Sequence, residues 1–356
     1  MKKKATKRTL LTVRETKKHP NNTQAKRNKP AESEDTMLDL LLLIVGFVLL
    51  IKGADFFVDG SSGLVKAFGV PGVIIGLTVV ALGTRAPELA VSTSAALQNS
   101  NEIALSNVVG SNTFNLLCVL GICAMISPVP VDNSILKRDF PFSLFSTIAV
   151  LVATGGLLHL NSGLTMNDNA GMVNRVTGAV LILFFIAYII VLILAAKKQS
   201  SDTDMSDLMP IWKCAVLILT GLGMIIAGGQ AVVYSAKNIA KSLGMTETLI
   251  GLTIVAIGTS LPELVTSIVA ARKKETGLAV GNAIGSNIFN LMLILGVSAF
   301  IHPVTVNLAS VFDMCILIFV TLITYIFCIT GKRISRIEGG VMVLLYIADM
   351  IFAIMR

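Results

Sequence analysis

Two glutamates, Glu88 and Glu263, lie inside long apolar stretches of the sequence, within the segments GTRAPEL and GTSLPEL. An ionised carboxylate within a bilayer is costly, so such a residue usually has a partner or a function. One glutamate alone could be a structural carboxylate, neutral or paired with a Lys or Arg. Two at matching positions make that alternative weaker, because facing carboxylates repel each other unless a cation lies between them. The pair therefore indicates cation-binding chemistry.

The glutamates belong to a duplicated stretch. Gly76–Gly121 aligns without a gap with Gly251–Gly296, at a constant offset of 175 residues, and about half of the aligned residues are identical. The identities cluster at polar and helix-breaking residues (Gly, Pro, Thr, Ser, Asn and Glu), and chance similarity between apolar helices would match Leu, Val and Ile instead of these. Further pairs share the offset: Gly46 with Gly221, Gly53 with Gly228, Lys66 with Lys241, Gly69 with Gly244, and Pro128 with Pro303.

Each copy supplies oxygen ligands around its glutamate. Pro87 and Pro262 lack an N–H and disrupt the bonds to the carbonyls four residues back, at Gly83 and Gly258. Carbonyls freed in this way, such as those near Ala81 and Ala256, can face a cavity and bind an ion. Residues four apart lie on one helical face. That spacing joins Thr84 to Glu88, Thr259 to Glu263, Ser111 to Asn115, and Ser286 to Asn290.

Carboxylate, hydroxyl, amide and carbonyl oxygens suit a hard cation such as Ca²⁺ or Na⁺. No Cys or His belongs to the set, which argues against zinc or copper. The glycines of the repeat, Gly110, Gly121, Gly285 and Gly296, are expected to allow close helix packing rather than to bind an ion. For Asn112 and Asn287, a hydrogen bond across helices and an ion contact are equally good interpretations.

The composition indicates an integral membrane protein. Of 356 residues, 54% are hydrophobic and 14% are charged, against about 25% charged in soluble domains. The net charge of +8 lies mainly in residues 1–36 and in short loops, which suits a membrane protein better than a nucleic-acid partner. The five cysteines lie in or beside apolar runs without metal-ligand spacing, so disulfides are not expected.

The apolar runs predict an all-α polytopic membrane protein with ten transmembrane helices, each near the ~20 residues that a span needs. The predicted spans are 37–59, 70–97, 103–126, 140–159, 176–196, 211–234, 246–271, 277–301, 309–330 and 337–355. Residues 1–36 are expected to form a disordered basic tail. Met37 opens the first span directly, so an alternative is that the chain starts there and the tail comes from a misassigned start codon.

The short loops predict the orientation. If residue 37 starts outside, the inside loops collect Lys66, Lys137, Arg138, Lys197, Lys198, Arg272, Lys273, Lys274, Lys332, Arg333 and Arg336. The outside holds only Arg175, Lys237, Lys241 and Arg356. This asymmetry places both ends of the ten-span core outside, although the basic tail favours the opposite orientation.

The duplication divides the chain into a first five-helix repeat at 37–196, a polar linker at 197–210 and a second five-helix repeat at 211–355. Because five is odd, the two repeats cross the membrane in opposite directions. Inverted repeats of this kind are typical of secondary transporters, which bind their substrate near the bilayer midplane between the halves.

The motifs GTSLPEL with GNAIGSNIFN, and GTRAPEL with SNVVGSNTFN, resemble the two alpha-repeats of the cation/calcium antiporters. The likeness is greatest to the bacterial sodium/calcium exchangers that resemble potassium-dependent exchangers, and it covers about 37–355. It implies ten helices, termini outside and alternating access. It also implies that Glu88 and Glu263 bind Ca²⁺ and take part in Na⁺ binding. The further ligands that it implies are Thr84, Thr259, Ser111, Ser286, Ser260, Asn115, Asn290, and the Ala81 and Ala256 carbonyls.

Two residues depart from the family pattern. The glycine that is Gly281 in the second copy is Ser106 in the first, a small change. The serine of the second copy, Ser260, is replaced by Arg85, three residues before Glu88 and close enough on a helix to pair with it. We expect that pair, which lowers the formal charge of the site from −2 to −1. Arg85 then either stands in for a transported Na⁺ or K⁺ or disables exchange; the alternative is that it turns away from the site.

The sequence thus predicts a secondary antiporter that exchanges Ca²⁺ for Na⁺ across the cytoplasmic membrane, with the ions as cargo and no cofactor. Alternatives are an H⁺- or K⁺-coupled exchanger, a passive cation channel, and a transport-impaired homologue in which Arg85 blocks the site. An enzyme is not expected, since no nucleophile–His pair or metal-ligand His cluster falls within the spans.

Overall fold

Helices make up nearly all of the structure, a computed structural model that describes residues 29–85, 88–89, 92–93, 101–159, 163–166, 168–199, 209–244 and 256–355. The α-helices are α1 (Lys29–Phe68), α2 (Gly72–Ile75), α3 (Ala81–Thr84), α5 (Asn101–Phe114), α6 (Leu120–Ile126), α7 (Phe140–Ala153), α8 (Arg175–Gln199), α9 (Ile211–Ser242), α11 (Ala256–Thr259), α12 (Leu261–Arg272), α13 (Thr276–Ile288), α14 (Leu295–Ile301), α15 (Leu308–Gly331) and α16 (Arg336–Met355). Short π-helical or 3₁₀ turns are η1 (Gly76–Val80), η2 (Asn115–Val119), η3 (Ile135–Asp139), η4 (Gly156–His159) and η7 (Phe289–Ile294).

Among the described residues, 6 helical stretches are long and apolar enough to cross a bilayer. They are Met37–Phe68, Leu105–Ile126, Arg175–Ala196, Ile211–Ser242, Thr276–Ile301 and Leu308–Gly331. Several spans of this length in one chain define a multi-pass helical membrane protein.

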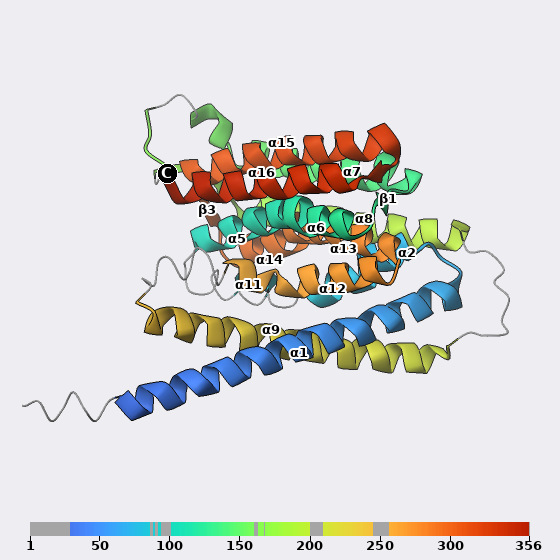
Figure 1. The fold of residues 1–356 in the computed structure, drawn as a ribbon. Helices are drawn as coiled ribbons and strands as arrows, with labels where there is room; N and C mark the ends of the chain where they lie inside the picture. Colours follow the sequence, from blue (N-terminus) through green and yellow to red (C-terminus); the bar gives the residue numbers. More distant parts are fainter. Residues whose placement is uncertain are drawn as a thin grey trace, which may run out of the picture.

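The spans differ in how deeply they lie inside the bundle. In Leu105–Ile126 and Thr276–Ile301, 72% and 78% of the most apolar window is buried, against 17% in Arg175–Ala196. Figure 1 shows α5, α6 and α13 in the middle of the molecule, with α15 and α16 on one side and α1 and α9 on the other. The two buried spans carry the GSN motifs of the duplication, so the repeated polar residues are at the centre of the bundle.

Helices α1 and α9 lie side by side along one face of the molecule (Figure 1). A Cβ atom on Gly228 would lie 2.7 Å from the Gly46 carbonyl oxygen, and one on Gly221 would lie 2.6 Å from that of Gly53. Glycine is therefore needed at this crossing, because any larger residue would push the backbones apart. The two contacts also exchange under the offset of 175, since Gly46 corresponds to Gly221 and Gly53 to Gly228.

The same correspondence appears at the ends of these helices. Gly69 follows α1 with φ of 59°, and Gly244 follows α9 with φ of 83°. Residues in this left-handed region commonly end helices, and glycine adopts it without strain. The glycine pair that the duplication singles out is thus a matched pair of helix stops.

Two short antiparallel strand pairs add to the predicted all-α fold. Strand β1 (Val129–Pro130) pairs with β4 (Arg333–Ile334), and β2 (Asn169–Val173) pairs with β3 (Val304–Asn307). β1 and β3 each follow one of the two buried spans, directly after the matched prolines Pro128 and Pro303. They join loops at the ends of helices and leave the helical architecture unchanged.

Most helices begin and end within a few residues of the predicted spans, but there are differences. Helix α1 begins at Lys29 rather than Met37, so the last part of the predicted disordered tail is helical; Pro30 stands in its first turn, where a missing N–H costs nothing. Helix α9 continues to Ser242, about two turns beyond the predicted end. Residues 1–28, most of the linker, Pro87 and the predicted start of the seventh span lie outside the described residues.

Candidate functional site

The two glutamates follow matching breaks in their helices. Helix α3 ends at Thr84, and helix α11 ends at Thr259. The next residue in each copy leaves regular helix geometry, with φ and ψ of −81° and −4° at Arg85 and −97° and 4° at Ser260. In the second copy, Pro262 then stands in the first turn of α12, which is consistent with a proline that interrupts a span and starts a new helix.

Both carboxylates are fully buried, and Arg85 bridges them. Glu88 and Glu263 have no exposed surface, and Arg85 is 2% exposed. Arg85 Nη1 lies 3.1 Å from Glu88 Oε1, and Arg85 Nη2 lies 2.9 Å from Glu263 Oε1. The expected pair with Glu88 is therefore present, and a second ion pair reaches the glutamate of the other copy. One guanidinium against two carboxylates gives a formal charge of −1 when both carboxylates are ionised.

Hydroxyl groups from both copies surround this centre. Ser111 Oγ lies 3.2 Å from Arg85 Nη1, 3.5 Å from Glu88 Oε1 and 3.0 Å from Ser260 Oγ. Asn290 Oδ1 accepts from Arg85 Nη1 at 3.4 Å. The structure thus brings these residues, predicted from two separate motifs, into contact around the guanidinium.

A second group of predicted residues meets at Asn282. Thr84 Oγ1 and Ser286 Oγ lie 3.3 Å and 3.4 Å from Asn282 Oδ1, while Asn282 Nδ2 donates to Ser267 Oγ at 2.9 Å. In the first copy, Asn107 Nδ2 donates to Ser92 Oγ at 3.3 Å. The sequence prediction missed Asn282, although its identity with Asn107 at the repeat offset was a usable signal.

Four asparagines connect the two buried spans. Asn112 Nδ2 donates to the Asn287 carbonyl oxygen, and Asn287 Nδ2 donates to that of Asn112, both at 3.2 Å. Asn115 Nδ2 donates to Asn287 Oδ1 at 3.1 Å, and Asn290 Nδ2 donates to Asn112 Oδ1 at 2.9 Å. Of the two interpretations of Asn112 and Asn287, the structure therefore supports the hydrogen bond across helices.

The backbone changes from α-helix to π-helix at Asn115 and next to Asn290. The π-helical turn η2 begins at Asn115, and η7 begins at Phe289 and includes Asn290. Such π-turns inside α-helices are frequent at functional sites, because they alter which side chains face the helix interface. Apolar periodicity does not reveal them.

Several buried oxygen atoms at the centre have no hydrogen-bond partner among the described residues. They include Glu88 Oε2, Glu263 Oε2 and Asn115 Oδ1. A buried polar atom without a partner is destabilising, so such atoms are rare unless a bound ion or water satisfies them. Carboxylate and amide oxygens are the ligands that hard cations prefer.

The other predicted site residues are only partly described. Ala81 is buried and lies beside Gly285, and Ala256 begins α11. Thr259 ends α11 and makes contacts of its own. Ion binding by these residues stays a prediction, as it does for the carbonyls of Ala81 and Ala256.

The repeated glycines do not all pack closely. A Cβ atom on Gly285 would lie 2.9 Å from Leu77 Cα, and one on Gly121 would lie 2.9 Å from the Gly339 carbonyl oxygen. A Cβ atom on Gly110 would have no atom of another described segment within 4 Å. The packing role predicted for Gly110 is therefore wrong: this glycine lines a cavity instead.

That cavity adjoins the centre formed by Arg85 and the two glutamates. It has a volume of about 140 Å³ and lies between α5, α15 and α16. Its lining includes Ser111, which contacts Arg85, and the half-buried carboxylates of Asp313 and Asp349. It gives a polar, acidic space next to the site.

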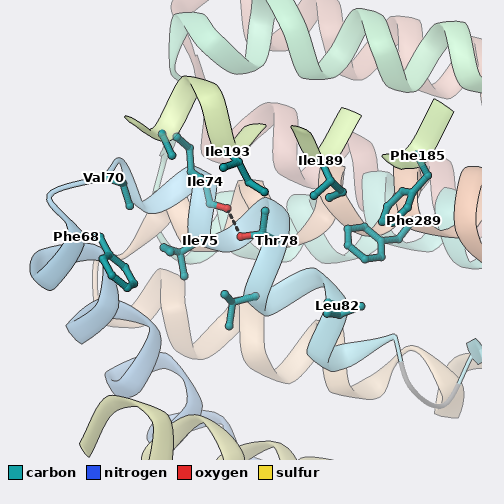
Figure 2. A pocket seen from close by; sticks show the side chains of 12 residues that line it. Phe68, Val70, Ile74, Ile75, Thr78, Leu82, Phe185, Ile189, Ile193 and Phe289 are labelled. Atoms are coloured by element: carbon teal, nitrogen blue, oxygen red, sulfur yellow. Dashed lines mark hydrogen bonds between the residues drawn. The ribbon is translucent and has the colours of Figure 1, made fainter. Parts of the chain in front are cut away.

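A larger cavity of about 710 Å³ lies elsewhere, between the second predicted span and α8. Figure 2 shows its lining, which is apolar apart from Thr78, whose hydroxyl donates to the Ile74 carbonyl oxygen at 2.7 Å. Phe185 and Phe289 form one end of it. No carboxylate is among the described residues that line this cavity, so the cavity lacks the ligands of a hard-cation site despite its size.

Fold and site together define a multi-pass membrane protein with a buried, oxygen-rich centre shared by two copies of one motif. The sequence matches the family described as "Sodium/calcium exchanger protein" over residues 38–194 and 213–355, one segment in each half of the chain. The chain belongs to this family. Its members are exchangers, so the protein is a transporter rather than an enzyme, and its ions are cargo rather than cofactors.

Individual relatives agree with the assignment. The sodium/calcium exchanger MaX1 of Methanosarcina acetivorans is 32% identical over 350 residues, covering 88% of this chain and 98% of the relative. The inner membrane protein YrbG of Escherichia coli is 35% identical over 320 residues, covering 87% and 94%. The solved structure of the sodium–calcium exchanger NCX_Mj, soaked without Na⁺ and Ca²⁺, superposes with a TM-score of 0.76 at 31% identity, covering 90% of this chain and 100% of that one.

Proposed function

We propose that the protein exchanges Ca²⁺ for Na⁺ across the cytoplasmic membrane by alternating access, with Glu88 and Glu263 as the central ligands. The observation that carries the proposal is the meeting of two fully buried glutamates from the two copies, each with a carboxylate oxygen that has no hydrogen bond within the described part of the chain. Such a centre attracts cations because Arg85 compensates only one of the two carboxylate charges. The relatives named as sodium/calcium exchangers suggest which cations these are.

The proposed architecture is ten spans in two inverted five-helix repeats, 37–196 and 211–355, joined by the linker 197–210 and with both ends of this core outside. The reciprocal hydrogen bonds between Asn112 and Asn287 and the exchanged glycine contacts between α1 and α9 support it. Contacts that exchange under a constant sequence offset are expected when two copies are related by a pseudo-twofold axis. In transporters built in this way the substrate binds near that axis.

Exchange follows from competition for the same oxygens. Ca²⁺ and Na⁺ both require the carboxylates of Glu88 and Glu263, so the site cannot hold a full load of both. Movement of one group of helices against the other then exposes the loaded site to the opposite side. The extended contact between α1 and α9, at the periphery of the bundle (Figure 1), makes this pair the best candidate for the moving group.

Uptake of ⁴⁵Ca²⁺ into everted or reconstituted vesicles tests the proposal. We expect Ca²⁺ uptake only when a Na⁺ gradient drives Na⁺ out of the vesicles. We expect this uptake to be lost in Glu88→Gln and in Glu263→Gln. Asp59→Asn is the matched control, because it makes the same carboxylate-to-amide change in a half-exposed residue that pairs with Lys273 outside the site. Full Ca²⁺ uptake in both glutamate variants would contradict the proposal.

The same assay separates the alternatives. A pH gradient or a K⁺ gradient that replaces the Na⁺ gradient would indicate H⁺- or K⁺-coupled exchange. Single-channel currents would indicate a channel, and the complete burial of the two glutamates speaks against an open pore. The absence of all flux in wild type, with flux in Arg85→Ser, would indicate a site blocked by Arg85.

A further inference from the structure

Arg85 occupies the place where a cargo cation would make its contacts. Its guanidinium nitrogens lie 3.1 Å from Glu88 Oε1 and 2.9 Å from Glu263 Oε1. Its other contacts, at 3.2 Å to Ser111 Oγ and 3.4 Å to Asn290 Oδ1, go to two further residues of the predicted ligand set. Four candidate ligand groups, drawn from both copies, therefore converge on a cation that is part of the chain.

A guanidinium and Ca²⁺ exclude each other at these oxygens. Ca²⁺ needs about six to eight oxygen ligands at short distance, and one oxygen of each glutamate already contacts Arg85. Arginine stays charged at physiological pH, so it cannot leave the site by losing its proton. Ca²⁺ can reach the full set of carboxylate oxygens only if the Arg85 side chain moves aside.

The contacts of Arg85 differ from those of a simple structural ion pair. One carboxylate would neutralise a buried arginine, yet Arg85 is shared by two. Among the described residues, no hydrogen bond to Glu88 Oε2 or Glu263 Oε2 is found while Arg85 is in place. The centre therefore keeps one negative charge together with acceptor oxygens. One bound monovalent cation neutralises this charge, whereas without Arg85 the two carboxylates would need two.

We propose that Arg85 is a tethered cation that takes the place of one transported monovalent ion and competes with Ca²⁺ for Glu88 and Glu263. This inference rests on the proposed function for the identity of the cargo ions. It makes two quantitative statements. The protein binds one Na⁺ fewer than a chain with serine at this position, and its affinity for Ca²⁺ is lower.

Equilibrium binding of ²²Na⁺ and ⁴⁵Ca²⁺ to the purified full-length protein tests both statements. We expect Arg85→Ser to bind one more Na⁺ per chain than wild type. We expect its Ca²⁺ affinity to rise by roughly tenfold or more, as the loss of a competing unit charge at this distance requires. Arg85→Gln, which keeps a long side chain without the charge, should shift both values in the same direction, and Arg85→Lys should keep the wild-type Na⁺ count.

The outcomes distinguish the role of Arg85 from the proposed function. Equal Na⁺ counts and equal Ca²⁺ affinities in wild type, Arg85→Ser and Arg85→Gln overturn the role of Arg85. A chain that binds Na⁺ but neither binds nor transports Ca²⁺ overturns the proposed exchange, while its Na⁺ count still decides whether Arg85 replaces an ion. Purification in saturating Na⁺ protects the variants, because the added cation compensates the two carboxylates that lose Arg85.

Discussion

Asn112 and Asn287 each donate a side-chain hydrogen bond to the other's backbone carbonyl oxygen, at the same distance of 3.2 Å in both directions. The two residues are equivalent in the duplication, so their contact marks the axis about which the two copies meet. Two more hydrogen bonds complete the arrangement: Asn115 Nδ2 donates to Asn287 Oδ1, and Asn290 Nδ2 donates to Asn112 Oδ1. This network holds the two buried spans against each other, and Asn290 connects it to Arg85.

Replacement of either central asparagine is expected to lower stability. Asn112→Ala leaves the Asn287 carbonyl oxygen and the Asn290 amide without their partners in a fully buried position. Each unsatisfied group costs about 1–3 kcal/mol, so we expect a clear drop in melting temperature in detergent, and Asn287→Ala should match it. Asn238→Ala, which removes a partly buried contact with Asp39, is the control. Unchanged melting of both central variants would contradict the structural role.

The crossing of α1 and α9 gives a second test with a control on the same helix. In Gly228→Ala, the new Cβ would lie 2.7 Å from the Gly46 carbonyl oxygen and 2.8 Å from Leu50 N, so the helices must separate. Overpacking of this kind costs about 1–3 kcal/mol. Gly223→Ala adds the same methyl group where no atom lies within 4 Å, and should be neutral or stabilising. Melting temperatures and ⁴⁵Ca²⁺ uptake measured together would show whether a tight crossing is also needed for transport.

The sequence predicted what depends on local pattern. Apolar runs predicted most helix limits to within a few residues, although α1 and α9 extend further, and the prolines after Gly-Thr predicted the breaks before Glu88 and Glu263. The duplication also identified Ser111 and Asn290, and the family resemblance identified Ser260; all three lie at the centre. Identical polar residues at a fixed offset were a stronger signal than any single motif.

What could not be predicted depends on how the two copies pack. The spacing of Arg85 and Glu88 indicated one ion pair along a helix, whereas the second pair joins residues far apart in the sequence, Arg85 and Glu263. The π-turns at Asn115 and Asn290 preserve the apolar pattern, so periodicity does not reveal them. Gly110 and Gly285 are equivalent in sequence, yet only Gly285 packs closely. The neighbours that decide this come from other helices.

The charge of the centre can be altered in steps. Glu263→Gln leaves Arg85 and Glu88 as a neutral pair, so we expect both Na⁺ and Ca²⁺ binding to weaken by roughly tenfold to a hundredfold. The double variant Arg85→Gln/Glu263→Gln restores the charge of −1 and should regain Na⁺ binding, while Ca²⁺ binding stays weak with only one carboxylate. Binding of ²²Na⁺ and ⁴⁵Ca²⁺ to the two variants checks this. Equal Na⁺ affinity in the single and the double variant would show that the charge of Arg85 does not act on the site.

The small acidic cavity beside Ser111 leads to the last prediction. Asp313 and Asp349 are half buried in the same 140 Å³ space as Ser111, so their charges raise the local concentration of cations next to the site. Asp349→Asn and Asp313→Asn should therefore raise the KM for Ca²⁺ a few-fold with little change in the maximal rate. The difference should shrink at high ionic strength, since salt screens partly exposed charges. Vesicle uptake measured at low and at high concentrations of choline chloride tests this, with Asp59→Asn as the control. A fall in the maximal rate with an unchanged KM would instead mean that these carboxylates act in the conformational step rather than in cation entry.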